Sequence, residues 1–104
     1  MSTLNCPEEV YLAEKLIGLH SWADMARFAR SGGEANAIAI RIARAACGKD
    51  KVAFCGYHGW HDWYIANTDL NDGIPKFNNK LAHSFNYNDL DSLEKIFKRL
   101  PNKV

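Results

Sequence analysis

The chain has 104 residues, of which 47% are hydrophobic and 24% charged, the size and composition of one small globular domain. Its 13 basic and 12 acidic residues give a net charge of +1, so no basic excess indicates nucleic acid or an anionic membrane as a partner. No apolar run is long enough to span a bilayer, and residues 1–5 lack the basic and apolar stretches of a signal peptide. Three cysteines without paired spacing predict free thiols in a cytoplasmic protein: Cys6, Cys47 and Cys55.

The first predicted helix begins at Pro7, because proline fits the first helical position. Glu8 and Glu9 follow it and favour the positive end of the helix dipole. Apolar residues then recur at three- and four-residue spacing and indicate an ordinary packing helix: Val10, Ala13, Leu16 and Ile17.

A strand-helix-strand unit is predicted next. Residues 25–29 are a short strand candidate, and an alanine-rich helix runs from about Gly33 to Cys47, with Gly48 suited to end it. The apolar run 52–55 has the length of a buried strand. Together these segments have the size of a βαβ unit. The helix is apolar on more than one side, which predicts burial between layers or against a partner.

Two glycines, Gly32 and Gly33, stand at the start of this helix. They leave backbone N–H groups unshielded where the helix dipole adds positive charge, which favours a phosphate or another anion. The alternative is a turn that needs glycine only for its backbone geometry. The spacing matches neither a Walker A motif nor the dinucleotide fingerprint, so a mononucleotide or another phosphorylated cofactor stays open.

The second unusual stretch is 56–64, which directly follows the second strand, where α/β proteins place binding loops. Tyr57 lies closest to the strand end and is the candidate for stacking on a flat ring. Trp63 and Tyr64 are expected in an aromatic core patch instead.

Cys55, His58 and His61 form a Cys-x-x-His-x-x-His run within the same stretch, which raises a zinc module as an alternative. A second ligand pair is missing, and a strand-to-loop transition would point these side chains apart. No metal site is therefore expected.

The remaining sequence predicts a polar loop over 67–80, a strand within 82–87 and a last helix. Asn88 or Asp89 is expected to cap that helix, and Pro101 limits it. Its predicted apolar face consists of Leu90, Leu93, Ile96, Phe97 and Leu100.

Three segments together resemble the class III pyridoxal-phosphate-dependent aminotransferases. Residues 28–35, Phe-Ala-Arg-Ser-Gly-Gly-Glu-Ala, are similar to the family's F-x-x-S-G-T-E-A segment, and residues 39–44 to its A-x-R-x-A-R helix. Residues 51–59 resemble its strand followed by Y-H-G. The resemblance covers residues 7–66 well, and within the class it is nearest to glutamate-1-semialdehyde 2,1-aminomutase and sugar-biosynthesis relatives.

The resemblance implies pyridoxal 5'-phosphate as cofactor and assigns it residues by position. The backbone amides of Gly32 and Gly33, together with Ser31, would hold the phosphate. Tyr57 would stack on the pyridine ring, and His58 would shape the same loop. The family commonly has threonine at the position of Gly33, and loss of that hydroxyl implies weaker phosphate binding.

The implied fold is α/β, a partial large domain of the PLP-dependent transferase fold type I, with residues 1–104 as a single partial domain from its N-terminal part. The family's Schiff-base lysine and the aspartate that pairs with the pyridine nitrogen lie far downstream, and Lys76 and Lys80 match no such motif. No catalytic residue is therefore assigned, and the isolated chain is expected to be inactive. A piece without the centre of its sheet is also expected to have low independent stability, to aggregate, or to assemble with another chain.

For the intact enzyme, the resemblance implies amino-group transfer to a carbonyl substrate, small-molecule amino donors and acceptors, and a homodimer. A glutamate-1-semialdehyde 2,1-aminomutase is one alternative. A non-enzymatic small α/β module that binds a ligand or a partner is another.

Overall fold

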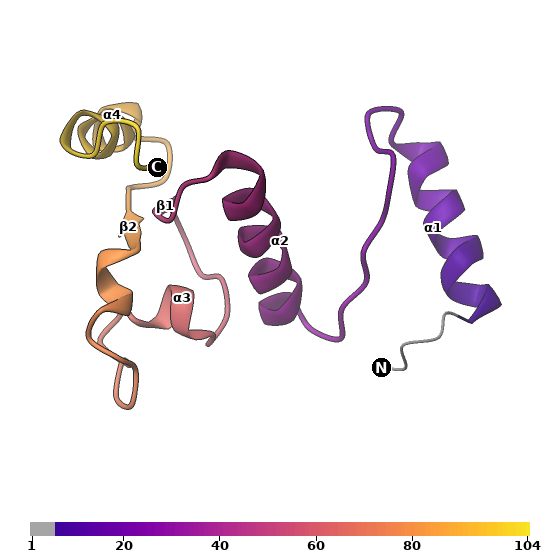
Figure 1. The fold of residues 1–104 in the computed structure, drawn as a ribbon, viewed down its shortest axis with the longest axis horizontal. Helices are drawn as coiled ribbons and strands as arrows, with labels where there is room; N and C mark the ends of the chain where they lie inside the picture. Colours follow the sequence, from indigo (N-terminus) through magenta and orange to yellow (C-terminus); the bar gives the residue numbers. More distant parts are fainter. Residues whose placement is uncertain (1–5) are drawn as a thin grey trace.

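A computed structural model describes residues 6–104; residues 1–5, on which the expectation of no signal peptide rests, lie outside the described part. Figure 1 shows helix α1 standing apart at one end of the molecule, helix α2 in the middle, and the remaining elements gathered at the other end. Between residues 6 and 104, no helix is long and apolar enough to cross a membrane. The elements in chain order are α1 (Pro7–Leu19), α2 (Gly32–Cys47), β1 (Val52–Phe54), α3 (Asp62–Ile65), η1 (Asn78–Lys80), β2 (Ala82–Ser84) and α4 (Leu90–Arg99).

Strands β1 and β2 form a two-stranded parallel sheet. Val52 lies opposite Ala82 and Phe54 opposite Ser84. Both strands are confirmed, although each is shorter than its predicted range. The connection between them contains α3 and η1, so the polar loop predicted over 67–80 includes one turn of 3-10 helix. Because the strands are parallel, both carboxyl ends lie at one edge of the sheet, where the chain leaves β1 toward α3.

The strand predicted over residues 25–29 is wrong. These residues are irregular and belong to the long segment that joins α1 to α2 (Figure 1). A strand needs a partner with which to share its ladder of hydrogen bonds, and no described segment pairs with this one. The predicted unit of this strand, α2 and β1 is therefore not formed, and the parallel pair is β1 with β2.

Helix α2 is capped at both ends. Ser31 is the N-cap residue, and its Oγ accepts a hydrogen bond from the Glu34 backbone N–H at 3.3 Å. The Glu34 carboxylate in turn accepts from the Arg30 backbone N–H at 2.8 Å. Gly48 ends the helix in the left-handed conformation, with φ 64° and ψ 26°, which confirms its predicted place.

Helices α1 and α4 also begin as predicted, at Pro7 and after an aspartate cap. Asp89 Oδ1 accepts a hydrogen bond from the Ser92 backbone N–H at 3.0 Å. That hydrogen bond, and a second from the Asn86 side chain, hold the pKa of Asp89 below its ordinary value. Helix α4 ends two residues before Pro101.

The buried core is small and aromatic. Phe54 of β1, Tyr64 of α3 and Ala82 of β2 form one cluster, with Trp63 and Ile65 packed against it. The rings of Phe54 and Tyr64 meet edge to face, with centroids 5.3 Å apart and an interplanar angle of 74°. The predicted core placement of Trp63 and Tyr64 is confirmed.

The two long helices remain outside this core. Neither α1 nor α2 contains a buried residue, so the predicted burial of α2 between layers does not occur within this chain. The accessible surface is 8323 Å², against roughly 5,900 Å² for a compact monomer of this mass. The radius of gyration is 16.3 Å, against about 13 Å for a compact domain of this length.

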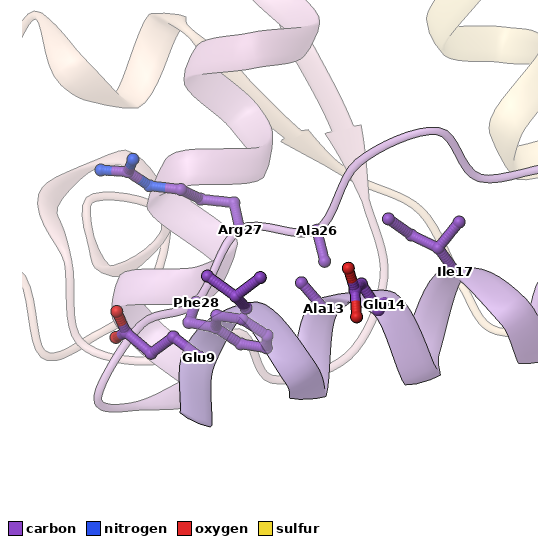
Figure 2. Close-up of a pocket in the computed structure, with 8 residues that line it drawn as sticks. Glu9, Ala13, Glu14, Ile17, Ala26, Arg27 and Phe28 are labelled. Carbon is purple, nitrogen blue, oxygen red and sulfur yellow. The ribbon is translucent and has the colours of Figure 1, made fainter. Parts of the chain in front are cut away.

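Helix α1 contacts the rest of the chain along an open hollow. Ala13 and Ile17 of α1 lie along it, together with Ala26 and Phe28 of the joining segment (Figure 2). Arg27 extends away from α1 in the same view (Figure 2). The hollow has a volume of about 300 Å³ and leaves the apolar side of α1 only partly covered.

Candidate binding site at the start of helix α2

The first turn of α2 presents two open backbone amides. The Ser31 carbonyl accepts a hydrogen bond from Ala35 N at 3.0 Å, and the Ser31 Oγ accepts one from Glu34 N. Among residues 6–104, the amides of Gly32 and Gly33 donate to no protein group. Both lie at the positive end of a 16-residue helix. This arrangement suits an anion, which would accept both hydrogen bonds and interact favourably with the dipole.

The polar side chains beside these amides already take part in hydrogen bonds within the turn. The Ser31 hydroxyl accepts from Glu34 N, so its proton remains available to a ligand. The Glu34 carboxylate is held by the Arg30 backbone N–H, which keeps its negative charge on that side of the turn. The turn therefore offers an anion two amide donors and one hydroxyl donor.

The loop after β1 packs directly against this turn through two glycines. A Cβ on Gly59 would lie 2.9 Å from the Gly33 Cα, and the Gly59 backbone has a φ of +102°. A side chain at position 59 would therefore strain the backbone and require the Gly33 backbone to move. Asn36 Nδ2 also donates to the His58 carbonyl at 3.3 Å. The start of α2 and the aromatic loop thus form one continuous surface.

His58 holds the loop from inside. Its Nε2 lies 2.6 Å from the Cys55 carbonyl oxygen, and because a carbonyl only accepts, Nε2 carries the proton. The His58 ring meets Tyr64 and Phe54 edge to face, with centroid distances of 5.6 Å and 6.1 Å. This part-buried side chain shapes the loop by packing and one hydrogen bond.

Tyr57 is one of two aromatic side chains that the loop presents outward, the other being Trp60. The Tyr57 side chain is 77% exposed, while its ring meets the buried Tyr64 edge to face, at a centroid distance of 5.6 Å. The contact with Tyr64 supports the ring from the protein side and leaves most of its surface free. Such a ring is available to stack on a planar ligand.

The zinc alternative finds no support in the geometry. Within the part of the chain that the structure describes, no three His, Cys, Asp or Glu side chains are gathered closely enough to hold a metal ion. The His58 Nε2 faces a backbone carbonyl, and the His61 Nδ1 lies beside Gly33. Cys55, His58 and His61 therefore do not converge.

The structure places the predicted phosphate turn beside the predicted stacking loop, through Gly33 and Gly59. Sequence reasoning missed the contact of His61 with Gly33. The sequence signal for this contact was the glycine at position 33, which does not indicate which residue occupies the space of its missing side chain.

Comparison with known proteins gives several matches over most of the chain, although no protein-family model matches it. The 3-aminobutyryl-CoA aminotransferase of Cloacimonas acidaminovorans (strain Evry) is 44% identical over 84% of this chain and 20% of that protein. The glutamate-1-semialdehyde 2,1-aminomutase of Methanococcus maripaludis is 34% identical over 93% of this chain and 25% of that protein. The chain thus spans about a fifth to a quarter of the length of these curated relatives.

Solved structures show the same likeness in three dimensions. The FumI protein of Sphingopyxis sp. MTA144, solved with PLP, covers 96% of this chain at a TM-score of 0.81 and 32% identity, and the match takes up 24% of that protein. A transaminase with PLP bound covers 94% of this chain at a TM-score of 0.81 and 27% identity, which is 26% of its own length.

The fold is therefore the α/β fold of PLP-dependent transaminases, present here as a fragment with a parallel sheet, and the predicted fold class is confirmed. The chain belongs to the family of pyridoxal-phosphate-dependent aminotransferases that also contains the glutamate-1-semialdehyde aminomutases. The predicted resemblance is confirmed with it.

Proposed function

We propose that this chain supplies the phosphate and ring contacts of pyridoxal 5'-phosphate in a class III aminotransferase that transfers an amino group to a carbonyl substrate. The observation that carries the proposal is the packing of Gly33 against Gly59. That contact puts two open amides at a helix start next to a loop with an outward-facing tyrosine.

The residues present fit this cofactor. The amides of Gly32 and Gly33 would bind the phosphate with the help of the helix dipole, and the Ser31 hydroxyl would donate a third hydrogen bond. Tyr57 would cover one face of the ring, and His58 would keep the loop in place. The cofactor, when bound, supplies the electron-withdrawing ring on which amino groups are exchanged.

The remaining groups that this chemistry needs would come from polypeptide outside residues 1–104. Lys76 and Lys80 lie on the segment before β2, and neither is assigned a catalytic role. The span of a fifth to a quarter of the relatives' length supports this division of roles. The isolated chain is accordingly expected to bind without turnover.

The exposed surface supports a proposal about partners. We infer that further polypeptide of the same enzyme, including a second subunit of a homodimer, covers the apolar sides of α1 and α2, which bury no residue within this chain. Small-molecule amino donors and acceptors would be the substrates. Free thiols at all three cysteines support a reducing, cytoplasmic setting.

An aminomutase is the second candidate, favoured by the relative from Methanococcus maripaludis, whose match extends over 93% of the chain. Both candidates use the same phosphate turn and the same ring contact. No specific observation favours a non-enzymatic binding module.

The experiment is a calorimetric titration of the 104-residue chain with pyridoxamine 5'-phosphate and, as the matched ligand, pyridoxamine. Neither compound has an aldehyde, so reaction with lysine side chains does not contribute. Charge-assisted hydrogen bonds to the phosphate are expected to make the phosphorylated compound bind at least about tenfold more tightly. Equal affinities would contradict a phosphate site in this chain.

A further inference from the structure

The side-chain space of residue 33 is already occupied in this fold. A Cβ built on Gly33 would lie 2.7 Å from Nδ1 and 2.9 Å from Cε1 of the His61 imidazole. Real Cβ atoms essentially never approach other atoms so closely. Position 33 therefore has no room for a methyl group while the imidazole of His61 stays where it is.

The backbone of His61 is fixed independently of its side chain. It is the N-cap residue of α3, and its carbonyl accepts from Tyr64 N and Ile65 N, both at 3.0 Å. The exposed Trp60 ring lies beside the imidazole, with ring centroids 5.5 Å apart. The imidazole thus reaches Gly33 from a part of the chain that the aromatic core anchors.

The contact depends on the volume of the ring and not on a hydrogen bond. His61 Nδ1 is buried and has no hydrogen-bond partner among the described residues. No hydrogen bond from Nδ1 to residues 6–104 holds the ring in place, so its contact with Gly33 is one of packing. Gly59 meets the same residue at its Cα.

We propose that His61 is a positioning residue for the phosphate-binding turn. Its imidazole takes the side-chain space of residue 33 and holds the Gly33 backbone against Gly59. Residues 33 and 61 then share one volume, so a side chain at 33 requires either a displaced imidazole or a smaller residue at 61. This inference rests on the proposed role of the turn as a phosphate site.

The first measurement is amide hydrogen exchange of the loop 56–61 in the 104-residue chain without ligand. Gly33→Ala is expected to raise exchange in this loop, because the added methyl displaces the imidazole and separates the loop from α2. When His61→Ala is added to Gly33→Ala, the exchange rates of this loop should return to within about twofold of those in the His61→Ala single variant. Gly32→Ala is the matched control: its Cβ would meet nothing within 4 Å, so loop exchange should not change.

The second measurement is the affinity ratio of pyridoxamine 5'-phosphate to pyridoxamine in the same variants. Overpacking at Gly33→Ala should reduce this ratio roughly tenfold or more. The ratio should recover when His61→Ala is added. His61→Phe keeps the ring and should keep the ratio within about twofold of the native value. A general loss of structure would lower both affinities and leave their ratio unchanged.

Additive effects of Gly33→Ala and His61→Ala on loop exchange would overturn the proposal, since residues that share one volume must be coupled. An unchanged affinity ratio in Gly33→Ala, with both ligands bound, would overturn it as well. Absence of any ligand binding would contradict the proposed function alone, because the exchange measurement needs no ligand.

Discussion

Tyr57 and Trp60 stand on the same loop with nearly equal exposure, 77% and 75%. Their supports differ, because the Tyr57 ring rests on the buried Tyr64 and the Trp60 ring leans on His61. Only Tyr57 is assigned to the cofactor ring. Substituting each residue in turn therefore tests whether the ligand stacks on Tyr57 in particular or on any exposed aromatic ring of the loop.

Tyr57→Leu is expected to weaken binding of pyridoxamine 5'-phosphate and of pyridoxamine alike, by about threefold to tenfold, because one aromatic pair is lost. Trp60→Leu serves as the control and should leave both affinities close to their native values. Calorimetry with both compounds measures the effect. A larger loss from Trp60→Leu than from Tyr57→Leu would contradict the assignment of the ring contact.

For individual residues, the sequence predicts those features that depend only on neighbours along the chain. Gly32 and Gly33 at a helix start, and the cap at Asp89, follow from local spacing. The contact of Gly33 with His61 joins residues 28 positions apart and depends on how α2 packs on the loop. No local pattern carries that information.

Among the elements, the helix ends at Pro7, Gly48 and Asp89 follow from the sequence, because each is set by residues within one turn, whereas the N-cap role of Ser31 comes from the structure. Residues 25–29 were predicted as a strand, but they pair with no segment between residues 6 and 104, and a strand needs a partner in its ladder. β1 and β2 are paired, and there the prediction of strands is confirmed.

His83 of β2 is expected to make stability depend on pH. Arg99 of α4 donates to His83 Nδ1 at 3.4 Å. Burial, then the positive charges of Lys51 and Arg99, hold the pKa of His83 below its ordinary value of 6.5. The unfolded chain therefore takes up the proton more readily than the folded chain. The contribution to stability is complete above pH 6.5 and is lost as the pH falls below that value.

The midpoint of thermal unfolding, followed by circular dichroism, is expected to fall between about pH 7.5 and about pH 5.5. His83→Gln cannot titrate in this range and should show a smaller fall. The other histidines contribute equally to both proteins, so the difference between the two curves reports His83. Parallel curves would contradict a lowered pKa of His83 in the folded chain.

Over the whole molecule, the accessible surface exceeds that of a compact monomer by roughly 2,400 Å². Trp22 and Met25 of the joining segment are 81% and 88% exposed. They line a groove of about 930 Å³ along one side of α2. Sequence periodicity predicted apolar faces on α1 and α2, and neither helix buries a residue within this chain.

Sedimentation equilibrium is expected to show the chain associating, with an average mass that rises above 11.7 kDa as concentration increases. The cause is burial of the exposed apolar surface between copies. The double variant Trp22→Ser, Met25→Ser should weaken association, whereas Tyr87→Ser, which removes another exposed aromatic side chain remote from this groove in sequence, should not. A constant mass of 11.7 kDa at all concentrations would rule out this use of the surface.

We propose that the start of α2 and the loop after β1 together hold a phosphorylated cofactor. A nuclear magnetic resonance titration of the chain with pyridoxamine 5'-phosphate tests it most directly. The amide signals of Gly32 and Gly33 are expected to shift together with those of the loop 56–61, and pyridoxamine is expected to move the loop signals without moving the two glycine amides. Shifts confined to lysine-rich surface segments, or the same response to both compounds at Gly32 and Gly33, would contradict it.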